Sequence, residues 1–328
     1  MYQPETYAVA LLFTILSMLC WGSWANTMKL CPGYRFQLFY WDYVLGLFVG
    51  VVLLGGTMGS AGSHGLPFFR DIVHADPHHV WLALTGGAIF NVANLLLVAA
   101  IDIAGLAVAF PVGIGLALVV GAMSSYIVAP AGNPAFLFGG ITIVVAAIIL
   151  DAAAYRAREK QKSITTRGVI LSLISGLLMG SFYPFVARAM SGREAPGPYA
   201  TAFYFAIGVG VCSLAANTLL MRKPLDGREP VAFEGYAGAP LAWHAWGILG
   251  GAIWMAGAIF NFTASQANIV GPAVSYSIGQ GATMISAAWG VLVWREFAAA
   301  PRRAKILLGW MFAFFLCGLA AIALAPVV

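Results

Sequence analysis

The residues of this sequence that could bind a solute or a proton are the polar side chains inside long apolar runs. An amide or carboxylate that faces hydrocarbon is costly, so such groups usually face the interior of a helix bundle or a wet cavity. Amides both donate and accept hydrogen bonds, and Trp and Tyr offer flat walls to a planar ring. The alternatives are hydrogen bonds between helices for the amides, and packing or interfacial positions for the aromatic residues. We expect one central cavity for a small polar solute, with eight candidate binding residues: Trp24, Asn91, Asn94, Tyr183, Trp254, Asn261, Tyr276 and Gln280.

Asp42 is the acidic residue that the sequence places clearly inside an apolar run, about one helical turn past the start of that run. A carboxylate inside a membrane is a candidate for binding and releasing a proton. We therefore expect Asp42 to be the proton-coupling residue. The alternative is that Asp42 caps its helix or pairs with Lys29 or Arg35. The other acids near apolar runs are expected at the ends of those runs: Asp102, Asp151 and Glu296.

Other kinds of chemistry find no support in the sequence. Four histidines lie in one connection, at spacings unlike those of a helix-borne zinc site: His64, His74, His78 and His79. The four cysteines lie in or beside apolar runs and show no metal-like pairing. No phosphate-binding Gly-Lys-Ser/Thr loop and no catalytic constellation is present. We expect no enzyme activity, no metal site and no cofactor.

The elements that position the candidate residues must be helices that cross a membrane. Of the 328 residues, 61% are hydrophobic and 9% are charged, whereas soluble domains carry roughly 25% charged residues. Only Glu5 is charged before the first apolar run, so we expect a retained helix and not a secretory signal. Runs near the ~20 residues needed to span a bilayer predict ten transmembrane helices. They lie near residues 7–28, 36–56, 80–101, 105–128, 134–154, 168–189, 198–221, 243–266, 270–293 and 304–326.

The basic residues predict which way these helices point. The connections after odd-numbered helices carry 14 of the 17 Lys and Arg residues. Basic connections remain in the cytoplasm, so we expect a multi-pass protein of the plasma (inner) membrane with both termini outside. The same bias accounts for the net charge of +5 without any nucleic-acid partner.

Residues 155–167 form a polar linker that divides the chain into residues 1–154 and residues 168–328. Each part holds five predicted helices, and five is odd, so a second copy would enter the membrane in the opposite orientation. A shift of 164 residues sets Gly86-Gly87 on Gly250-Gly251, and a shift of 158 sets Gly22-Ser23 on Gly180-Ser181. We therefore expect an all-α membrane protein built from two inverted five-helix repeats.

Several short stretches, spread over nearly the whole chain, resemble the ureide permease family of the drug/metabolite transporter superfamily. They are Gly22-Ser23-Trp24 with Met28, Asp42-Tyr43, Gly86-Gly87 with Asn91 and Asn94, Gly105-Leu106-Ala107-Val108, Ala202-Phe203-Tyr204-Phe205, and Trp289-Gly290-Val291-Leu292 with Arg295-Glu296. The resemblance implies the ten-helix, two-repeat fold and uptake of a ureide such as allantoin, or of a nucleobase, driven by protons. The chain departs from the family at Val112-Gly113-Ile114-Gly115, which looks more like the sugar-transporting branch.

Three other functions remain open at this stage. One is a proton symporter for a hexose, a pentose or a rhamnose-like sugar. Another is an exporter of drugs or amino acids within the same superfamily. The third is a membrane receptor or structural subunit, against which the lack of a sizeable soluble domain speaks. The lipid bilayer is the expected surrounding, and a homo-oligomer is compatible with the sequence.

Overall fold

The computed structural model describes residues 1–158, 165–267 and 269–328. Most of the predicted linker, residues 159–164, lies outside the described residues, as does Asn268. Throughout the described ranges all regular structure is helical, as predicted.

Nine helices carry most of the chain. They are α1 (Tyr7–Ser23), α2 (Phe36–Gly56), α4 (Pro77–Ala104), α6 (Gly115–Val128), α7 (Pro134–Arg158), α8 (Thr166–Ala189), α9 (Pro198–Arg222), α11 (Leu241–Gln266) and α14 (Arg302–Leu324). Shorter helices join or extend them: the 3-10 helix η1 (Trp24–Leu30), α3 (Phe68–His74), α5 (Leu106–Ala109), the π-helix η2 (Phe110–Ile114), α10 (Glu234–Ala237), α12 (Gly271–Gly279), α13 (Ala282–Ala288) and the π-helix η3 (Trp289–Val293).

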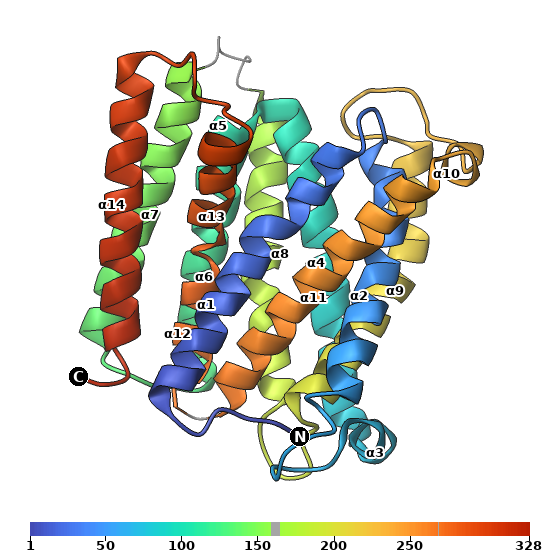
Figure 1. Cartoon of the computed structure of the whole chain (residues 1–328), viewed down its shortest axis with the longest axis vertical. Coiled ribbons are helices and arrows are strands. Elements are labelled where there is room, and N and C mark those ends of the chain that lie inside the picture. The colour runs from blue at the N-terminus through green and yellow to red at the C-terminus, as the bar shows by residue number, and fades with distance from the viewer. Residues whose placement is uncertain (159–164, 268) are drawn as a thin grey trace.

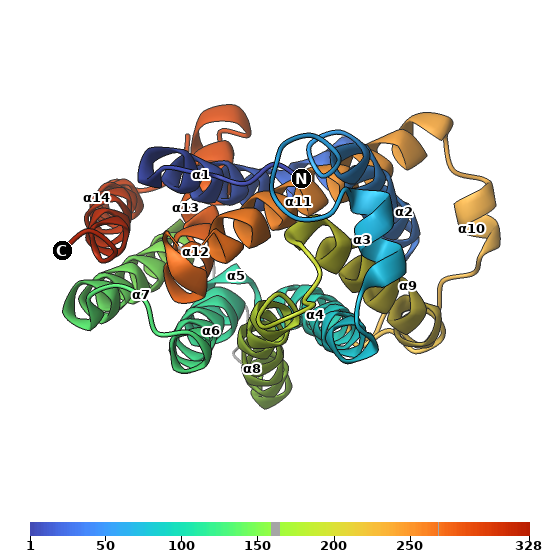
Figure 2. The ribbon, with the colours of Figure 1, turned by 90° about the horizontal axis from the view of Figure 1, so that it is seen from below.

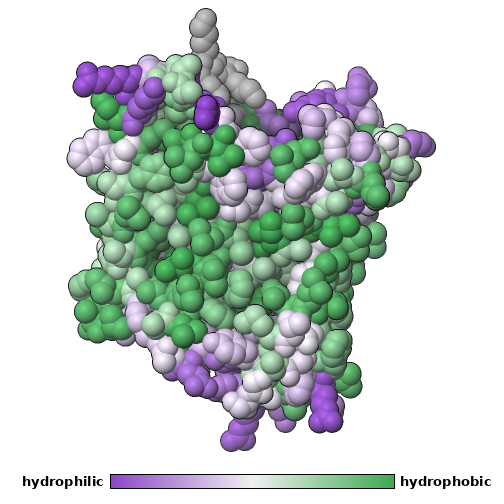
Figure 3. All heavy atoms as spheres, viewed as in Figure 1, coloured by the Kyte–Doolittle hydropathy of each residue, from purple (hydrophilic) through white to green (hydrophobic). Residues whose placement is uncertain are grey.

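Within the described part of the chain, nine helical segments are long and apolar enough to cross a membrane, with η1 counted as the continuation of α1 and η2 from Pro111 counted with α6. Eight of them agree with predicted spans to within four residues at each end, and the fourth begins at Pro111, six residues after the predicted start at residue 105. The tenth predicted span, 270–293, is not one continuous helix, because a turn at Gln280 and Gly281 separates α12 from α13 and η3 follows. The expected all-helical membrane fold is thus confirmed with nine continuous segments among the described residues. The broken segment α12–α13 is not among them, so the predicted count of ten spans is not confirmed. Figure 3 shows the corresponding hydrophobic band across the middle of the molecule, with hydrophilic residues gathered at both ends.

Both termini lie at one end of the helix bundle, which we call the terminal end (Figure 1). The last residues of α7 and the first residues of α8 lie at the opposite end, which we call the linker end. Seen along the bundle, α7 and α14 pack together at one edge, and α2, α9 and α10 lie toward the other edge (Figure 2).

Glycines allow two pairs of helices to cross closely, and the two crossings are alike. Where α2 crosses α11, a Cβ added to Gly251 would overlap the carbonyl oxygen of Tyr43. Where α9 crosses α4, a Cβ added to Gly87 would overlap the carbonyl oxygen of Phe205. Gly87 and Gly251 are the residues that the shift of 164 superimposes. Small residues at such contacts let membrane helices approach and gain packing energy.

A second pair of crossings repeats in the same way. A Cβ on Gly22 of α1 would lie 2.6 Å from the carbonyl oxygen of Ala282 at the start of α13. A Cβ on Gly180 of α8 would lie 2.9 Å from the carbonyl oxygen of Ala117 in α6. These two glycines are the ones that the shift of 158 superimposes. The residues before and after the linker therefore use glycines at matching positions for these close contacts.

Candidate substrate-binding site

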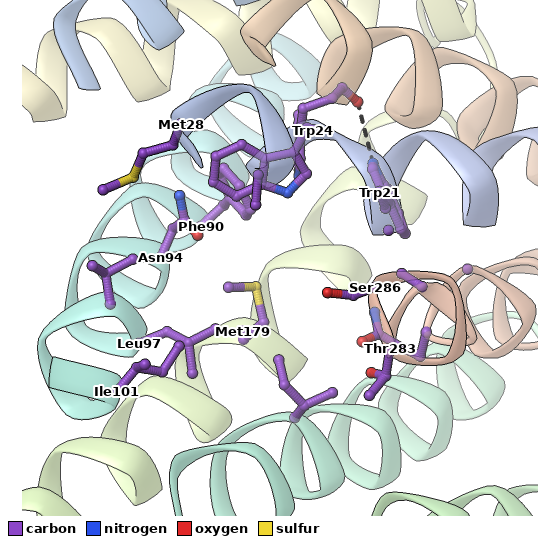
Figure 4. Close-up of a pocket in the computed structure, with 18 of the residues that line it drawn as sticks. Trp21, Trp24, Met28, Phe90, Asn94, Leu97, Ile101, Met179, Thr283 and Ser286 are labelled. Atoms are coloured by element: carbon purple, nitrogen blue, oxygen red, sulfur yellow. Dashed lines mark hydrogen bonds between the residues drawn. The ribbon is translucent and has the colours of Figure 1, made fainter. Parts of the chain in front are cut away.

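A cavity of about 240 Å³ lies among α1 with η1, α4, α8, α11 and the broken segment α12–α13 (Figure 4). Its walls are mainly apolar and aromatic. The residues that lie deepest in the bundle are Phe90 on α4 and Trp254 on α11, both near the middle of their helices. From Phe90, the α4 wall continues through Asn94 and Leu97 to Ile101. Because α4 ends at Ala104 on the side of the linker end, the cavity extends from mid-bundle toward that end.

An aromatic layer separates this cavity from the terminal end. The ring of Trp254 lies 4.3 Å from the ring of Phe90 and stacks on Phe205 at 5.8 Å. Phe182 packs edge-on against Phe90 at 5.4 Å and against Tyr276 at 6.2 Å. Phe205 and Tyr276 do not line the cavity, so packed aromatic side chains bound it on the side of the terminal end.

Polar groups enter the cavity from two directions. Asn94 of α4 lies on one side and bonds weakly, through its amide nitrogen, to the Tyr40 hydroxyl at 3.4 Å. Gln280, Thr283 and Ser286 line the cavity from the broken segment, at intervals of three residues that place them on one face. Figure 4 shows Thr283 and Ser286 on the side of the cavity away from Asn94. The side chains of these three residues make no hydrogen bond to any other described residue, so they are free to bind a solute.

Four of the eight candidate binding residues line the cavity: Trp24, Asn94, Trp254 and Gln280. The break between α12 and α13 explains how Gln280 reaches it, since this residue sits in the turn and not in mid-helix as expected. Sequence reasoning missed Trp21, Thr283 and Ser286. The spacing of Thr283 and Ser286 from Gln280 was the available signal. That signal is weak because hydroxyl side chains in apolar helices often bond their own backbone.

The other four candidates are buried and do not line the cavity in this conformation. The Asn91 side-chain oxygen accepts hydrogen bonds from the Tyr40 hydroxyl at 2.8 Å and the Ser213 hydroxyl at 2.9 Å. The Tyr183 hydroxyl donates to the side-chain oxygen of Asn261.

Tyr276, the fourth of these buried candidates, has its hydroxyl 3.2 Å from the carbonyl oxygen of Ala117 and 3.3 Å from that of Met179. In this conformation Asn91 and Asn261 make hydrogen bonds between helices, the alternative left open for the amides. Tyr183 and Tyr276 are packed inside the bundle, the alternative left open for the aromatic residues.

Asp42 lies outside the cavity, in a buried cluster toward the linker end. It is 1% exposed, and both carboxylate oxygens lie within 3.0 Å of His244 Nδ1. The hydroxyls of Tyr236 and Tyr34 also donate to it, at 2.7 Å and 3.3 Å. Burial, reinforced by this carboxylate, raises the pKa of both tyrosines, which keeps them protonated as donors. The cluster joins α2, α10, α11 and the η1–α2 connection around one carboxylate–imidazole pair.

The alternative in which Asp42 pairs with Lys29 or Arg35 is wrong. Lys29 pairs with Glu296, and Arg35 bonds to the Glu229 carbonyl at 3.4 Å. Sequence reasoning missed His244, although this histidine falls inside the predicted span 243–266. Its 202-residue separation from Asp42 left no local signal of their contact.

Asp151 also corrects an expectation. It was expected at the end of an apolar run, but α7 continues to Arg158, so Asp151 lies about two helical turns inside the helix. The residue is 2% exposed, and one of its carboxylate oxygens has no hydrogen-bond partner among the residues described. The described residues also contain no cluster of three or more His, Cys, Asp or Glu side chains placed to hold a metal ion.

Comparison of the chain with known proteins identifies the family to which it is similar. Ureide permease 1 of Arabidopsis thaliana is 22% identical to this chain over an alignment of 388 residues, gaps included. The alignment covers 98% of this chain and 98% of the permease. Ureide permease 4 and ureide permease 2 of the same plant are 22% and 21% identical, at the same coverage. A solved crystal structure that is 17% identical covers 94% of this chain and 96% of its own with a TM-score of 0.62, which shows a shared fold. The model of the ureide permease family matches residues 39–169 and 163–325. The chain therefore belongs to the ureide permease family.

Proposed function

We propose that this protein imports a small polar solute, a ureide such as allantoin or a nucleobase, by alternating access across the plasma membrane. The cavity carries this proposal. It lies at mid-bundle in a helical membrane protein and offers free amide and hydroxyl groups between aromatic walls. Discontinuous helices at such positions commonly form the solute site of secondary transporters. The relatives named ureide permeases, aligned over 98% of the chain, supply the substrate class.

The chemistry of the cavity favours a flat amide over a sugar. Trp24 and Trp254 can cover the faces of a planar ring, while Asn94 and Gln280 bond its edges. A sugar presents hydroxyls on every side, but only two walls of this cavity carry polar side chains. In the stretch that resembles the sugar branch, Ile114 contributes a hydrocarbon side chain to the cavity. We therefore rank ureide or nucleobase import above sugar symport and above drug or amino-acid export as the proposed function.

Proton coupling and topology complete the proposal. Asp42 is the coupling residue, and the His244 contact gives its proton a partner inside the bundle. The excess of basic residues at the linker end supports a topology with residues 155–167 in the cytoplasm and both termini outside. The repeats 1–154 and 168–328 then rock against each other about the matched glycine crossings, which alternates access to the cavity.

Uptake into proteoliposomes tests this function. With an inward proton gradient, purified protein should accumulate radiolabelled allantoin or uracil, and a protonophore should abolish the accumulation. Asn94→Leu and Gln280→Leu should each remove most of the uptake. The matched control is Asn217→Leu, because Asn217 is a buried amide that bonds the Gln37 carbonyl at 2.8 Å and does not line the cavity.

The control should transport like the parent. Parental uptake in both cavity variants would place the solute elsewhere. Uptake of pentoses or hexoses with no competition from ureides or nucleobases would assign the protein to the sugar branch.

A further inference from the structure

The deepest point of the cavity coincides with the centre of the internal repeat. The shift of 164 sets Phe90 on Trp254 and sets the first residue of α4, Pro77, on the first residue of α11, Leu241. Phe90 and Trp254 are therefore equivalent residues, and their rings meet at 4.3 Å. Equivalent residues of two inverted copies touch each other only where the pseudo-twofold axis passes between them. Each wall of the cavity on the linker side thus has an equivalent on the terminal side.

The equivalents of three cavity-lining residues form one cluster on the terminal side. The shift of 158 takes Ala25 of η1 to Tyr183 of α8. The shift of 164 takes Leu97 and Ile101 of α4 to Asn261 and Ser265 of α11, respectively. All three equivalents are buried, and Ser265 is 4% exposed. On the linker side these positions carry small or apolar residues that face an open cavity, whereas on the terminal side they carry polar groups packed together.

We propose that Tyr183, Asn261 and Ser265 line a second solute vestibule that opens to the terminal end, and that the Tyr183–Asn261 hydrogen bond is its gate. This inference rests on the proposed alternating-access function. It explains why polar groups occupy a buried region toward the terminal end. In the closed conformation they bond one another, and in the open conformation they face water and the arriving solute.

The hydrogen bonds of Asn261 show how the gate holds the terminal side closed. Its side-chain oxygen accepts from Tyr183 of α8. Its amide nitrogen donates to the Ser17 hydroxyl of α1 at 3.2 Å and to the Ser275 carbonyl of α12 at 2.9 Å. One side chain of α11 therefore ties together three other helices, all of which also line the cavity. Parting the helices on the terminal side must break these bonds.

A second layer of bonds lies beyond the gate, at the end of α11. Gln266 donates to the carbonyl oxygens of Met190 and Pro196, at 3.3 Å and 3.4 Å, and accepts a bond from Gln3 at 2.9 Å. These contacts fasten α11 to the α8–α9 connection, one residue beyond Ser265. The vestibule is thus closed both at the gate and at its mouth in this conformation.

Accessibility labelling tests the vestibule. In a background in which the four cysteines are replaced, Ser265→Cys protein in proteoliposomes is exposed to a membrane-impermeant maleimide. A separate His64→Cys variant, in the α2–α3 connection, reports which vesicles present the terminal end to the reagent. The matched control is Thr201→Cys, because Thr201 is 0% exposed and lies near the terminal end of α9. A shift of 162 sets the first residue of α2, Phe36, on the first residue of α9, Pro198, and makes Phe39 the equivalent of Thr201. Phe39 does not line the cavity.

The Ser265→Cys variant should react from the terminal end and the Thr201→Cys variant should not. Adding Tyr183→Phe removes the gate bond and should speed the labelling about threefold, the factor expected for one hydrogen bond between membrane helices. Ala258→Cys, at the position equivalent to Asn94, replaces Ser265→Cys if the latter does not fold. Absent labelling in protein that transports normally, equal labelling of Thr201→Cys, or no effect of Tyr183→Phe overturns the vestibule. Labelling as expected in protein that transports no ureide or nucleobase supports the vestibule and refutes the proposed substrate.

Discussion

Replacing Asp42 with Asn preserves the shape of the side chain and removes its ability to carry a proton. Tyr236 donates to Oδ1 of Asp42 and Tyr34 donates to Oδ2, so the amide oxygen of Asn can accept one of these bonds, and the hydroxyl that meets the amide nitrogen can turn to accept from it. His244 loses the carboxylate that lies within 3.0 Å of its ring. We therefore expect Asp42→Asn protein to fold and to bind solute, but to lose the coupling between solute and proton movement.

The size of the effect follows from the single carboxylate in this cluster. If one Asp42–His244 pair carries one proton per solute, a gradient of about one pH unit supplies about 1.4 kcal/mol, or roughly tenfold accumulation. The parent should concentrate its solute about tenfold in vesicles under that gradient. The Asp42→Asn variant should only equalise the inside and outside concentrations.

The assay measures both net accumulation and exchange in the same proteoliposomes. Exchange of internal for external solute does not require a proton to be released, so the Asp42→Asn variant should keep it. The control is Asp226→Asn, because Asp226 lies outside the cluster and pairs with Arg228 at 3.1 Å. Roughly tenfold accumulation by the Asp42→Asn variant would refute the assignment, and loss of accumulation in the control as well would show that the effect is not specific to this cluster.

Two further predictions concern the helix contacts. Gly251→Ala places a Cβ against the Tyr43 carbonyl and should destabilise the protein by about 1–3 kcal/mol, seen as a lower melting temperature in detergent, whereas Gly309→Ala, where an added Cβ meets nothing within 4 Å, should not. Burial raises the pKa of Glu296, but hydrogen bonds and charges from Lys29 and Arg158 outweigh it and hold the pKa below the usual value. The stabilisation from Glu296 is therefore present at neutral pH and lost as the pH falls through that lowered pKa. The melting temperatures of parent and Glu296→Gln protein should converge on acidification, and a gap independent of pH would contradict this reasoning.

The sequence predicts the membrane-spanning segments well because their signal is local. A helix that crosses lipid needs a continuous apolar run, and nine predicted spans match helices of the structure. The break at Gln280–Gly281 escaped prediction because its consequence depends on packing. Gly279 and Gly281 allow Trp21 and Met18 to approach the backbone there. Glycines by themselves do not mark an interruption, because Gly86 and Gly87 lie inside the unbroken helix α4.

The candidate site was only partly predictable, because these helices are apolar on every side. A soluble amphipathic helix shows from its pattern which face is buried, but an all-apolar helix does not reveal its rotation. Asn91 and Asn94 lie on the same helix, yet only Asn94 lines the cavity. In the same way, the Asp42–His244 pair depends on how α2 and α11 cross, which is a property of the whole fold.

Under the proposed alternating access, the aromatic layer around Phe90 and Trp254 also sets the affinity measured from the terminal end. A solute that arrives from that end binds only while the layer is parted. Its apparent dissociation constant is then the intrinsic constant divided by the fraction of molecules in the open form. A substitution that stabilises the closed aromatic layer raises the apparent dissociation constant measured from the terminal end. It hardly changes the dissociation constant measured from the linker end, because binding from that end does not require the layer to open. One binding site thus shows unequal affinities at its two faces, and their ratio reports the resting balance between the two conformations.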